Sequence, residues 1–227
     1  MAYVNRTLIS PQMAPFTGSL GGGSGEPRTG LLAKLRAATR TEHDPIEASL
    51  GLLRASLTVQ RYRKIVERFH GYYAPLEAAL AHARTAVAPH LDLPDSARTA
   101  LLARDLEALG STAPAALPRC SFLPALETRG AVIGCMYVLE GATLGGQLVT
   151  RHVMATLGLA PDRGCAFFFG DGDRTAARWK AFSRLLTEFS GAQPTSHVDA
   201  IVAAVATFRT FRLWWDAADL RHGSTIP

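Results

Sequence analysis

One histidine of this 227-residue chain lies one helical turn before a glutamate. His43 and Glu47 are four residues apart in LRAATRTEHDPIEASL, residues 35–50, so on a helix they share a face. A carboxylate there would accept the Nδ1–H of the imidazole and leave Nε2 electron-rich, which is how an axial metal ligand is oriented. The alternative is a partly buried histidine at a helix end beside a solvent-facing glutamate, since such pairs are common on helix surfaces.

A second pattern is a helix with many glycines. The stretch YVLEGATLGGQLVTRH, residues 137–152, has helical character but contains Gly141, Gly145 and Gly146, and Gly130 and Gly134 precede it. Each glycine in a helix interior costs about 1 kcal/mol relative to alanine. Two explanations are open: another helix packs closely here, or a flat ligand lies against a backbone that carries no side chains.

A third pattern is a pair of cations one turn apart. Lys180 and Arg184 lie on one face of ARWKAFSRLL, residues 177–186, and two cations at this spacing suit an anion such as a carboxylate. The alternative is the solvated basic face of an amphipathic helix. Taken together, a histidine for iron, a bare backbone face and cations for carboxylates describe a site for a planar, iron-bearing dicarboxylate, which is haem.

The elements that must position these residues are helices. Apolar residues recur at helical spacing in six segments, and no segment alternates convincingly at period two. Pro45 is expected to disturb or end the first helix, Pro75 to kink the second and Gly110 to stop the third. We therefore expect a single all-α domain over residues 29–227, after a Gly/Ser-rich flexible tail at 1–28. The expected helices cover about 29–44, 58–83, 96–109, 124–157, 174–189 and 196–219.

Composition excludes several other classes of protein. The net charge of +5 mildly favours acidic partners or anionic ligands, but no Lys/Arg run indicates nucleic-acid binding. Three cysteines without metal-site spacing predict free thiols in a reducing cytosol. The most apolar region, 131–159, is interrupted by polar residues, and no signal peptide is visible. We therefore expect a soluble, cytoplasmic protein with no membrane partner.

The three stretches, in this order, resemble the haem oxygenase family in its bacterial form. LRAATRTEH followed by Glu47 resembles the proximal helix, and YVLEGATLGGQ resembles the distal helix. FFFGDGDRTAARWKAFSRLL resembles the segment that reaches the haem propionates. The resemblance covers about residues 29–219 and implies haem held between the proximal and distal helices. It also implies O₂-dependent cleavage of haem to biliverdin, Fe²⁺ and CO.

The resemblance implies a role for each candidate residue. His43 would be the iron ligand and Glu47 its hydrogen-bonded partner. Gly141 and Gly145 would place their backbone against haem and bound O₂, and so act in catalysis. The propionates would be held by three cations, namely Arg36, Lys180 and Arg184.

This chain departs from the animal-type pattern at one position. Animal-type members carry an aspartate where Ala142 stands, and that aspartate orders water near the oxygen. Here the water would be held by backbone carbonyls, Thr143 or Gln147.

The source of electrons and the fate of the product also follow from the resemblance. No G-x-G-x-x-G loop follows a strand, so electrons must come from a separate donor, such as a ferredoxin-like protein or a reductase. The biliverdin acceptor would be a protein such as a bacteriophytochrome.

Two other functions are open. One is a haem carrier or sensor with this fold and no turnover. The other is a thiaminase-like helical enzyme with Cys135 as nucleophile, although the apolar run around Cys135 predicts a buried and unreactive thiol.

Overall fold

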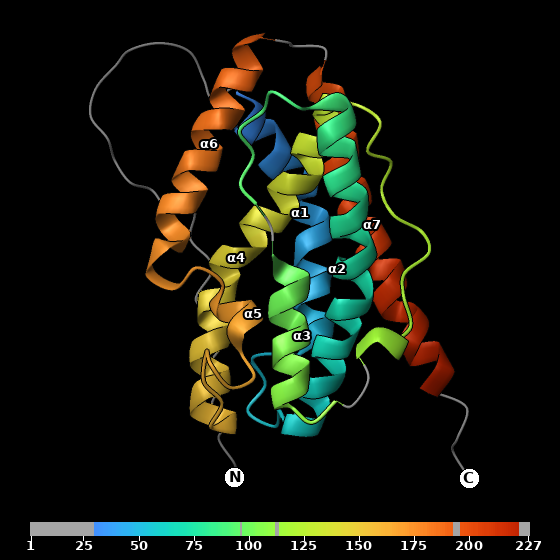
Figure 1. The fold of residues 1–227 in the computed structure, drawn as a ribbon, viewed down its shortest axis with the longest axis vertical. Coiled ribbons are helices and arrows are strands. Elements are labelled where there is room, and N and C mark those ends of the chain that lie inside the picture. The colour runs from blue at the N-terminus through green and yellow to red at the C-terminus, as the bar shows by residue number, and fades with distance from the viewer. Residues whose placement is uncertain (1–29, 96, 112–113, 193–195, 223–227) are drawn as a thin grey trace, which may run out of the picture.

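The computed structural model describes residues 30–95, 97–111, 114–192 and 196–222. Over these ranges the chain is helical, and its β pairing is limited to isolated bridges at Ala160 (Figure 1). The predicted all-α fold is confirmed, whereas the predicted tail, 1–28, lies outside the described residues. The α-helices are α1 (Leu31–Leu50), α2 (Val59–Val87), α3 (Arg98–Ala108), α4 (Arg129–Leu157), α5 (Ala166–Phe169), α6 (Thr175–Ala192) and α7 (Ser196–His222), with 3-10 turns η1 (Pro114–Ala116) and η2 (Gly172–Arg174).

Local side-chain chemistry sets several helix ends. As predicted, Thr58 caps α2, because its hydroxyl accepts a hydrogen bond from the N–H of Arg61 at 3.2 Å. Gly110, the predicted stop signal, follows α3 with φ of 77°. The helix α4 begins at Arg129, later than predicted, because Thr128 is its N-cap and accepts from the N–H of Ala131 at 3.1 Å.

Pro45, which was expected to disturb or end the first helix, does not end it. Proline removes one backbone hydrogen bond from a helix, yet α1 continues to Leu50. Ile46 and Leu50 are both buried, and their packing on the core holds the last turn in place. Gly51, with φ of 64°, then terminates the helix in the left-handed conformation. His43 and Glu47 therefore lie on one continuous helix.

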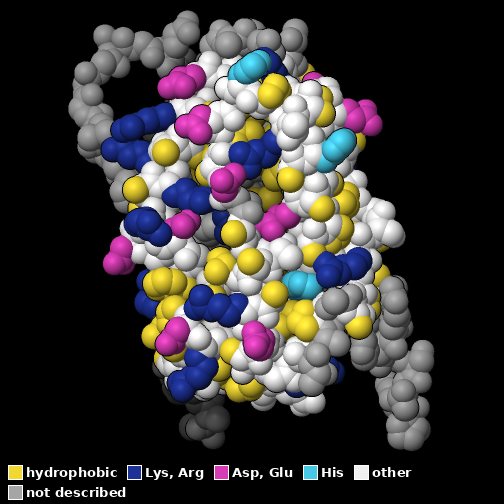
Figure 2. Space-filling view, in the orientation of Figure 1, with side chains coloured by type: hydrophobic (Ala, Val, Ile, Leu, Met, Phe, Trp, Pro, Cys, Tyr) yellow, Lys and Arg dark blue, Asp and Glu magenta, His cyan; other side chains and the backbone are white. Residues whose placement is uncertain are grey.

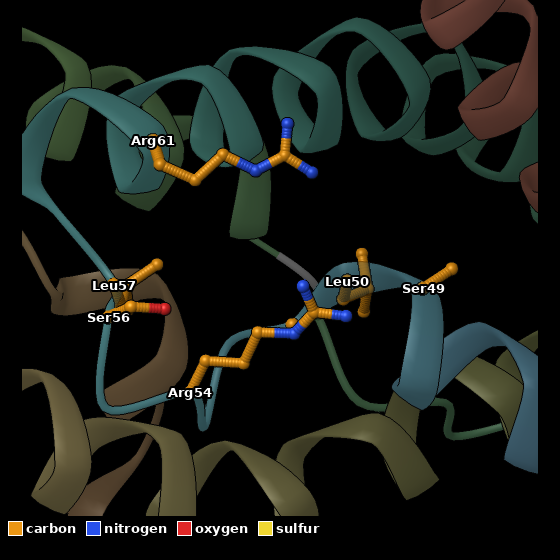
Figure 3. Close-up of a pocket in the computed structure, with 7 residues that line it drawn as sticks. Ser49, Leu50, Arg54, Ser56, Leu57 and Arg61 are labelled. Carbon is orange, nitrogen blue, oxygen red and sulfur yellow. The ribbon is translucent and has the colours of Figure 1, made fainter.

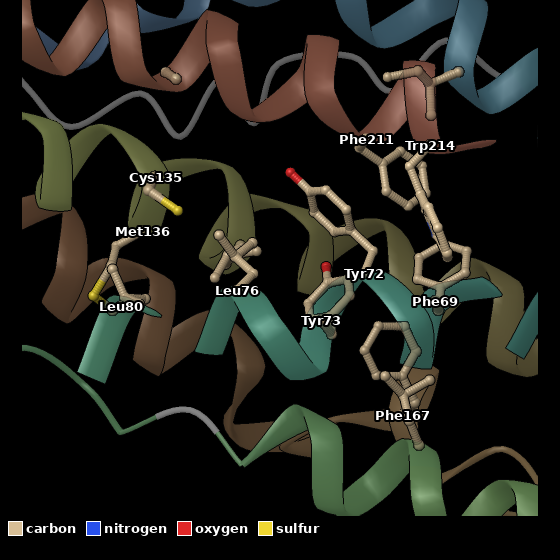
Figure 4. Close-up of a cluster of buried hydrophobic side chains, with 14 of the residues drawn as sticks. Phe69, Tyr72, Tyr73, Leu76, Leu80, Cys135, Met136, Phe167, Phe211 and Trp214 are labelled. Atoms are coloured by element: carbon tan, nitrogen blue, oxygen red, sulfur yellow. The ribbon is translucent and has the colours of Figure 1, made fainter. Parts of the chain in front are cut away.

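The helices pack around α4 and α7, which lie along each other. α1 packs on α7 and α6, α2 packs on α3 and α4, and α5 fills the space between α3 and α4 (Figure 1). The core is rich in aromatic rings contributed by α2, α5 and α7 (Figure 4). Phe69 lies 5.2 Å from Phe211, and Tyr73 lies 5.1 Å from Phe167, between ring centroids. These contacts fix α2, α5 and α7 relative to one another.

One described helix, α4, is long and apolar enough to cross a membrane by length and composition. Its most apolar window has a mean hydropathy of 1.3, but 56% of that window is buried inside the protein. A core helix meets the same criteria, and α4 packs against α2, α5, α6 and α7. Its apolar surface is thus largely accounted for by neighbouring helices.

Candidate functional site

The glycines of α4 divide into two groups according to what lies beside them. A Cβ atom at Gly130 or Gly134 would collide with the backbone of α7, at Ser196 and Ala200 respectively. A Cβ at Gly146 would collide with the carbonyl oxygen of Phe168. These three glycines allow close backbone packing, which was one of the two explanations for the glycine-rich sequence.

No such contact explains Gly141 and Gly145. A Cβ at Gly145 would meet no described atom within 4 Å, and a Cβ at Gly141 would only touch the ring of Trp179 at 3.8 Å. Both φ angles lie outside the left-handed region that favours glycine. Since neither packing nor backbone conformation requires glycine here, the open faces of these residues are available to a ligand.

Two contacts show how α1 lies relative to α4. Tyr137 on α4 lies near Thr39 and Arg36 on α1, which both act to lower the pKa of its phenol against the rise that burial causes. Further along, Nε2 of His152 on α4 lies 3.1 Å from the carbonyl oxygen of Arg54, just beyond α1. The two helices therefore run in the same direction, and each contact joins residues 98 positions apart in sequence.

The proximal and distal candidates lie between these two contacts. One turn beyond Thr39 on α1 is His43, and one turn beyond Tyr137 on α4 is Gly141. One further turn along each helix lie Glu47 and Gly145. The predicted histidine and the predicted glycines thus lie on two helices that run in the same direction, although these residues are far apart in sequence.

The His43 side chain is 41% exposed and has contacts on two sides. Its Nε2 atom lies 3.6 Å from Oε1 of Glu47, and its ring meets that of Phe208 edge-on, with centroids 5.9 Å apart. The nitrogen nearest Glu47 is therefore Nε2, whereas we had expected a hydrogen bond from Nδ1. The neighbouring Glu42 is buried and accepts a hydrogen bond from Nε of Arg209 at 2.8 Å, which fastens this turn of α1 to α7.

The three predicted propionate-binding cations, Arg36, Lys180 and Arg184, are all exposed. The structure brings Arg36 close to Tyr137: burial raises the pKa of Tyr137, while the hydrogen bond with Thr39 and the charge of Arg36 partly offset this rise. Lys180 directly follows Trp179, whose ring lies 6.1 Å from that of Tyr137. Sequence reasoning did not single out Tyr137, which lies between the glycines and these cations.

A buried ion pair lies next to the open glycine face. Glu140 is 1% exposed and accepts two hydrogen bonds from Arg178 of α6, at 2.7 and 2.8 Å. A second cation, Arg98 of α3, lies 3.4 Å from the same carboxylate. Arg178 was missed from the sequence, but the signal was present: a carboxylate inside an apolar helix needs a buried cation partner.

The described residues contain a small cavity elsewhere, at the C-terminal end of α1. It has a volume of about 110 Å³, and the side chains of Arg54 and Arg61 extend into it from the α1–α2 loop and from α2 (Figure 3). Ser49, Leu50, Gly51, Ser56 and Leu57 complete its lining.

The structure removes the basis for cysteine chemistry at Cys135. The side chain is fully buried in α4, and burial raises the pKa of its thiol to about 12. A thiol that stays protonated at neutral pH is not a nucleophile. All three cysteines are free, as predicted, and all three are buried. In the described part of the chain, no three His, Cys, Asp or Glu side chains are grouped so that they could hold a metal ion.

The haem oxygenase family model matches residues 29–217, which is most of the chain. The chain belongs to the haem oxygenase family. The family match spans α1 with His43, α4 with its glycines and α6 with its cations.

Individual relatives support this assignment. The haem oxygenase of Xanthomonas campestris pv. campestris (strain 8004) is 32% identical over 115 residues, which cover 50% of this chain and 64% of that relative. The chain thus matches just under two thirds of the relative's length. The crystal structures of the NO- and CO-bound haem oxygenase from Neisseria meningitidis share the fold, with a TM-score of 0.67 at 20% identity. That match covers 83% of this chain and 92% of the other.

Proposed function

We propose that this protein is a haem oxygenase that cleaves haem to biliverdin, Fe²⁺ and CO, with O₂ as co-substrate. The observation that carries the proposal is the pair of glycines on α4, Gly141 and Gly145, which no contact within the described protein requires. The helix that carries them runs in the same direction as α1, which carries His43. Bound haem supplies the reactivity toward O₂ and is itself the substrate that is opened.

On this proposal, His43 binds the haem iron through its imidazole. Neutral imidazole is the proximal ligand of O₂-binding haem proteins. The carboxylate of Glu47, one turn on, then orients the ring, and Phe208 limits its rotation from the α7 side. Glu42, held by Arg209, keeps this turn of α1 at a fixed position on α7.

The α4 backbone forms the opposite wall. Without side chains at Gly141 and Gly145, a flat ligand could approach the helix backbone. Arg36, Lys180 and Arg184, which are all exposed, would hold the carboxylates at the solvent-facing edge of that ligand.

Proton delivery is assigned to water held by backbone carbonyls of α4. Of the two side chains expected as alternatives, Thr143 donates its hydroxyl hydrogen to the carbonyl of Glu140 at 2.6 Å. Gln147 donates to the carbonyl of Phe169 at 2.8 Å and lies 3.2 Å from Oγ1 of Thr175. Both side chains thus already have hydrogen-bond partners within the protein, and Ala142 offers only a methyl group.

We further propose that electrons come from a separate donor, either a ferredoxin-like protein or a reductase, and that a bacteriophytochrome-like protein accepts the biliverdin. The net charge of +5 suits an acidic donor. On the face shown in Figure 2, Lys and Arg side chains are interspersed with Asp and Glu, so that face presents no single basic patch.

The test is to titrate the purified protein with haem, record the Soret band, and then add O₂ with ascorbate or a reductase system. We expect a stoichiometric complex, loss of the Soret band and formation of biliverdin, CO and ferrous iron. A stable complex without turnover would instead make the protein a haem carrier or sensor. Absence of any haem complex would overturn the proposed site.

A further inference from the structure

The ion pair between Glu140 and Arg178 joins two helices, α4 and α6, beside the proposed site. Glu140 belongs to α4 and precedes Gly141, while Arg178 belongs to α6 and precedes Trp179. The pair is bidentate, a geometry that fixes orientation as well as distance. Arg178 also donates to the carbonyl oxygen of Asp95 at 2.7 Å, which ties the segment before α3 to the same point.

Each residue of the pair is followed by a residue that borders the open face of α4. A Cβ at Gly141 would lie 3.8 Å from the Trp179 ring, which would be its nearest described neighbour apart from adjacent residues and the backbone of α4 itself. The same ring lies 6.1 Å from both Tyr137 and Phe182, so it fills the corner between α4 and α6. Lys180 and Arg184 follow on α6, and any change in how α6 docks on α4 would move the ring and both cations together.

We propose that Glu140 and Arg178 are positioning residues that set the in-plane rotation of haem. This inference rests on the proposed function. Haem is nearly symmetric apart from its propionates, so its rotation depends on where the cations and the bulky ring stand relative to the distal helix. The ion pair fixes that relation. It joins Arg178, which directly precedes Trp179, to Glu140, which directly precedes Gly141.

The test compares Arg178→Met and Arg178→Lys with the wild-type holoprotein. Arg178→Met removes the clamp but leaves Arg98 at 3.4 Å to neutralise Glu140, so the fold should persist. Arg178→Lys keeps the charge but loses the bidentate geometry. Arg63→Met is the matched control, because it breaks a 3.6 Å ion pair with Glu67 that lies within the single helix α2 and involves no residue of α4 or α6.

The first readout is the set of hyperfine-shifted haem methyl resonances in the ferric complex, which distinguishes seatings of the haem without any turnover. We expect one dominant set in the wild type and the control. A second set should appear in Arg178→Met, with the ratio of seatings changed about tenfold, equivalent to about 1.4 kcal/mol. Arg178→Lys should be intermediate.

The second readout is the indole N–H signal of Trp179 in the protein without haem. It should shift or broaden in Arg178→Met, while the signals of Trp214 and Trp215 stay in place. If Arg178→Met lowers only the thermal midpoint and leaves both the methyl and the indole spectra unchanged, the pair is merely structural and the inference is overturned. Failure of the proposed function looks different, because the wild type itself would then form no haem complex.

Discussion

At the scale of single residues, alanine substitutions of the two groups of α4 glycines should have opposite effects on the stability of the protein without ligand. Gly141→Ala and Gly145→Ala should each raise the free energy of unfolding by up to about 1 kcal/mol, because alanine favours the helix and its methyl group meets nothing closer than 3.8 Å. Gly134→Ala should lower it, because the methyl group collides with Ala200. Urea unfolding of the apo-proteins measures both effects. Equal destabilisation by Gly145→Ala and Gly134→Ala would show that protein atoms occupy both faces.

A larger side chain at the open face should separate ligand binding from stability. Gly145→Leu is expected to reduce haem affinity more than tenfold, which corresponds to about 1.4 kcal/mol, while the apo-protein unfolds near the wild-type urea concentration. The reason is that leucine would fill space that only the ligand uses. Ala155→Leu, an exposed site further along the same helix, is the control for a bulky residue on α4. Unchanged haem affinity in Gly145→Leu would place haem elsewhere.

Replacement of His43 tests the iron ligand. His43→Ala should abolish turnover and shift the Soret band, while the helical circular dichroism stays unchanged because the side chain is only partly buried. Added imidazole should restore a spectrum close to that of the wild type, since it can occupy the vacated space. His82→Ala, an exposed site on α2, serves as control. A wild-type spectrum in His43→Ala would assign the iron to another histidine.

At the scale of elements, α6 brings two cations to the site, and their loss should change the product. Lys180→Ala and Arg184→Ala each remove an interaction of about 1.5–3 kcal/mol, whereas a tenfold shift between two haem seatings requires only about 1.4 kcal/mol. We expect mainly the α isomer of biliverdin from the wild type and a mixture of isomers from the variants, with modestly weaker haem binding. Chromatographic separation of the products measures this.

The control for the α6 variants is Lys64→Ala, an exposed cation on α2. It should give the wild-type product. If the Lys180→Ala/Arg184→Ala double variant gave a single unchanged isomer at unchanged haem affinity, both cations would belong to the solvated basic face of the helix and not to the site.

Elements whose ends depend on local chemistry were predictable, and those that depend on tertiary contacts were not. Thr58 and Gly110 mark helix ends in the sequence because a hydroxyl cap and a left-handed residue act on their own neighbours. The continuation of α1 past Pro45 depends on burial of Ile46 and Leu50 against helices that the local pattern does not reveal. The start of α4 at Arg129, after the predicted residue 124, is an exception: it is set by a local cap, Thr128, that the apolar pattern alone did not locate.

The same distinction applies to the site. The sequence indicated His43, Glu47 and the glycines through their spacing on single helices. Spacing alone did not show why Gly145 and Gly146 differ, because the difference is a carbonyl of Phe168 that packs against Gly146 and not against Gly145. Nor did it indicate Arg178, whose partner Glu140 is 38 residues away in sequence.

At the scale of the whole molecule, one buried histidine should make stability depend on pH. Burial, with a smaller contribution from the charge of Arg119, lowers the pKa of His70 in the folded protein. The unfolded chain therefore binds more protons as the pH falls below the ordinary histidine value of about 6.5, and stability falls with it. We expect the urea midpoint to drop between pH 7.5 and pH 5.5, and to drop less in His70→Gln. An equal drop in both proteins would assign the pH dependence to other groups.

The large separation of α1 and α4 in sequence determines when the site can form during synthesis. One wall is built from residues 31–50 and the other from 129–157, and α1 is fastened to α7 through Glu42 and Arg209. Contacts this distant in sequence form late, because the intervening chain must first be made and folded. In a nascent chain that still lacks α7, His43 has already been made, but the helix α1 that carries it is not yet held in place. The emerging polypeptide would therefore not capture haem, and the cofactor would enter a nearly finished fold.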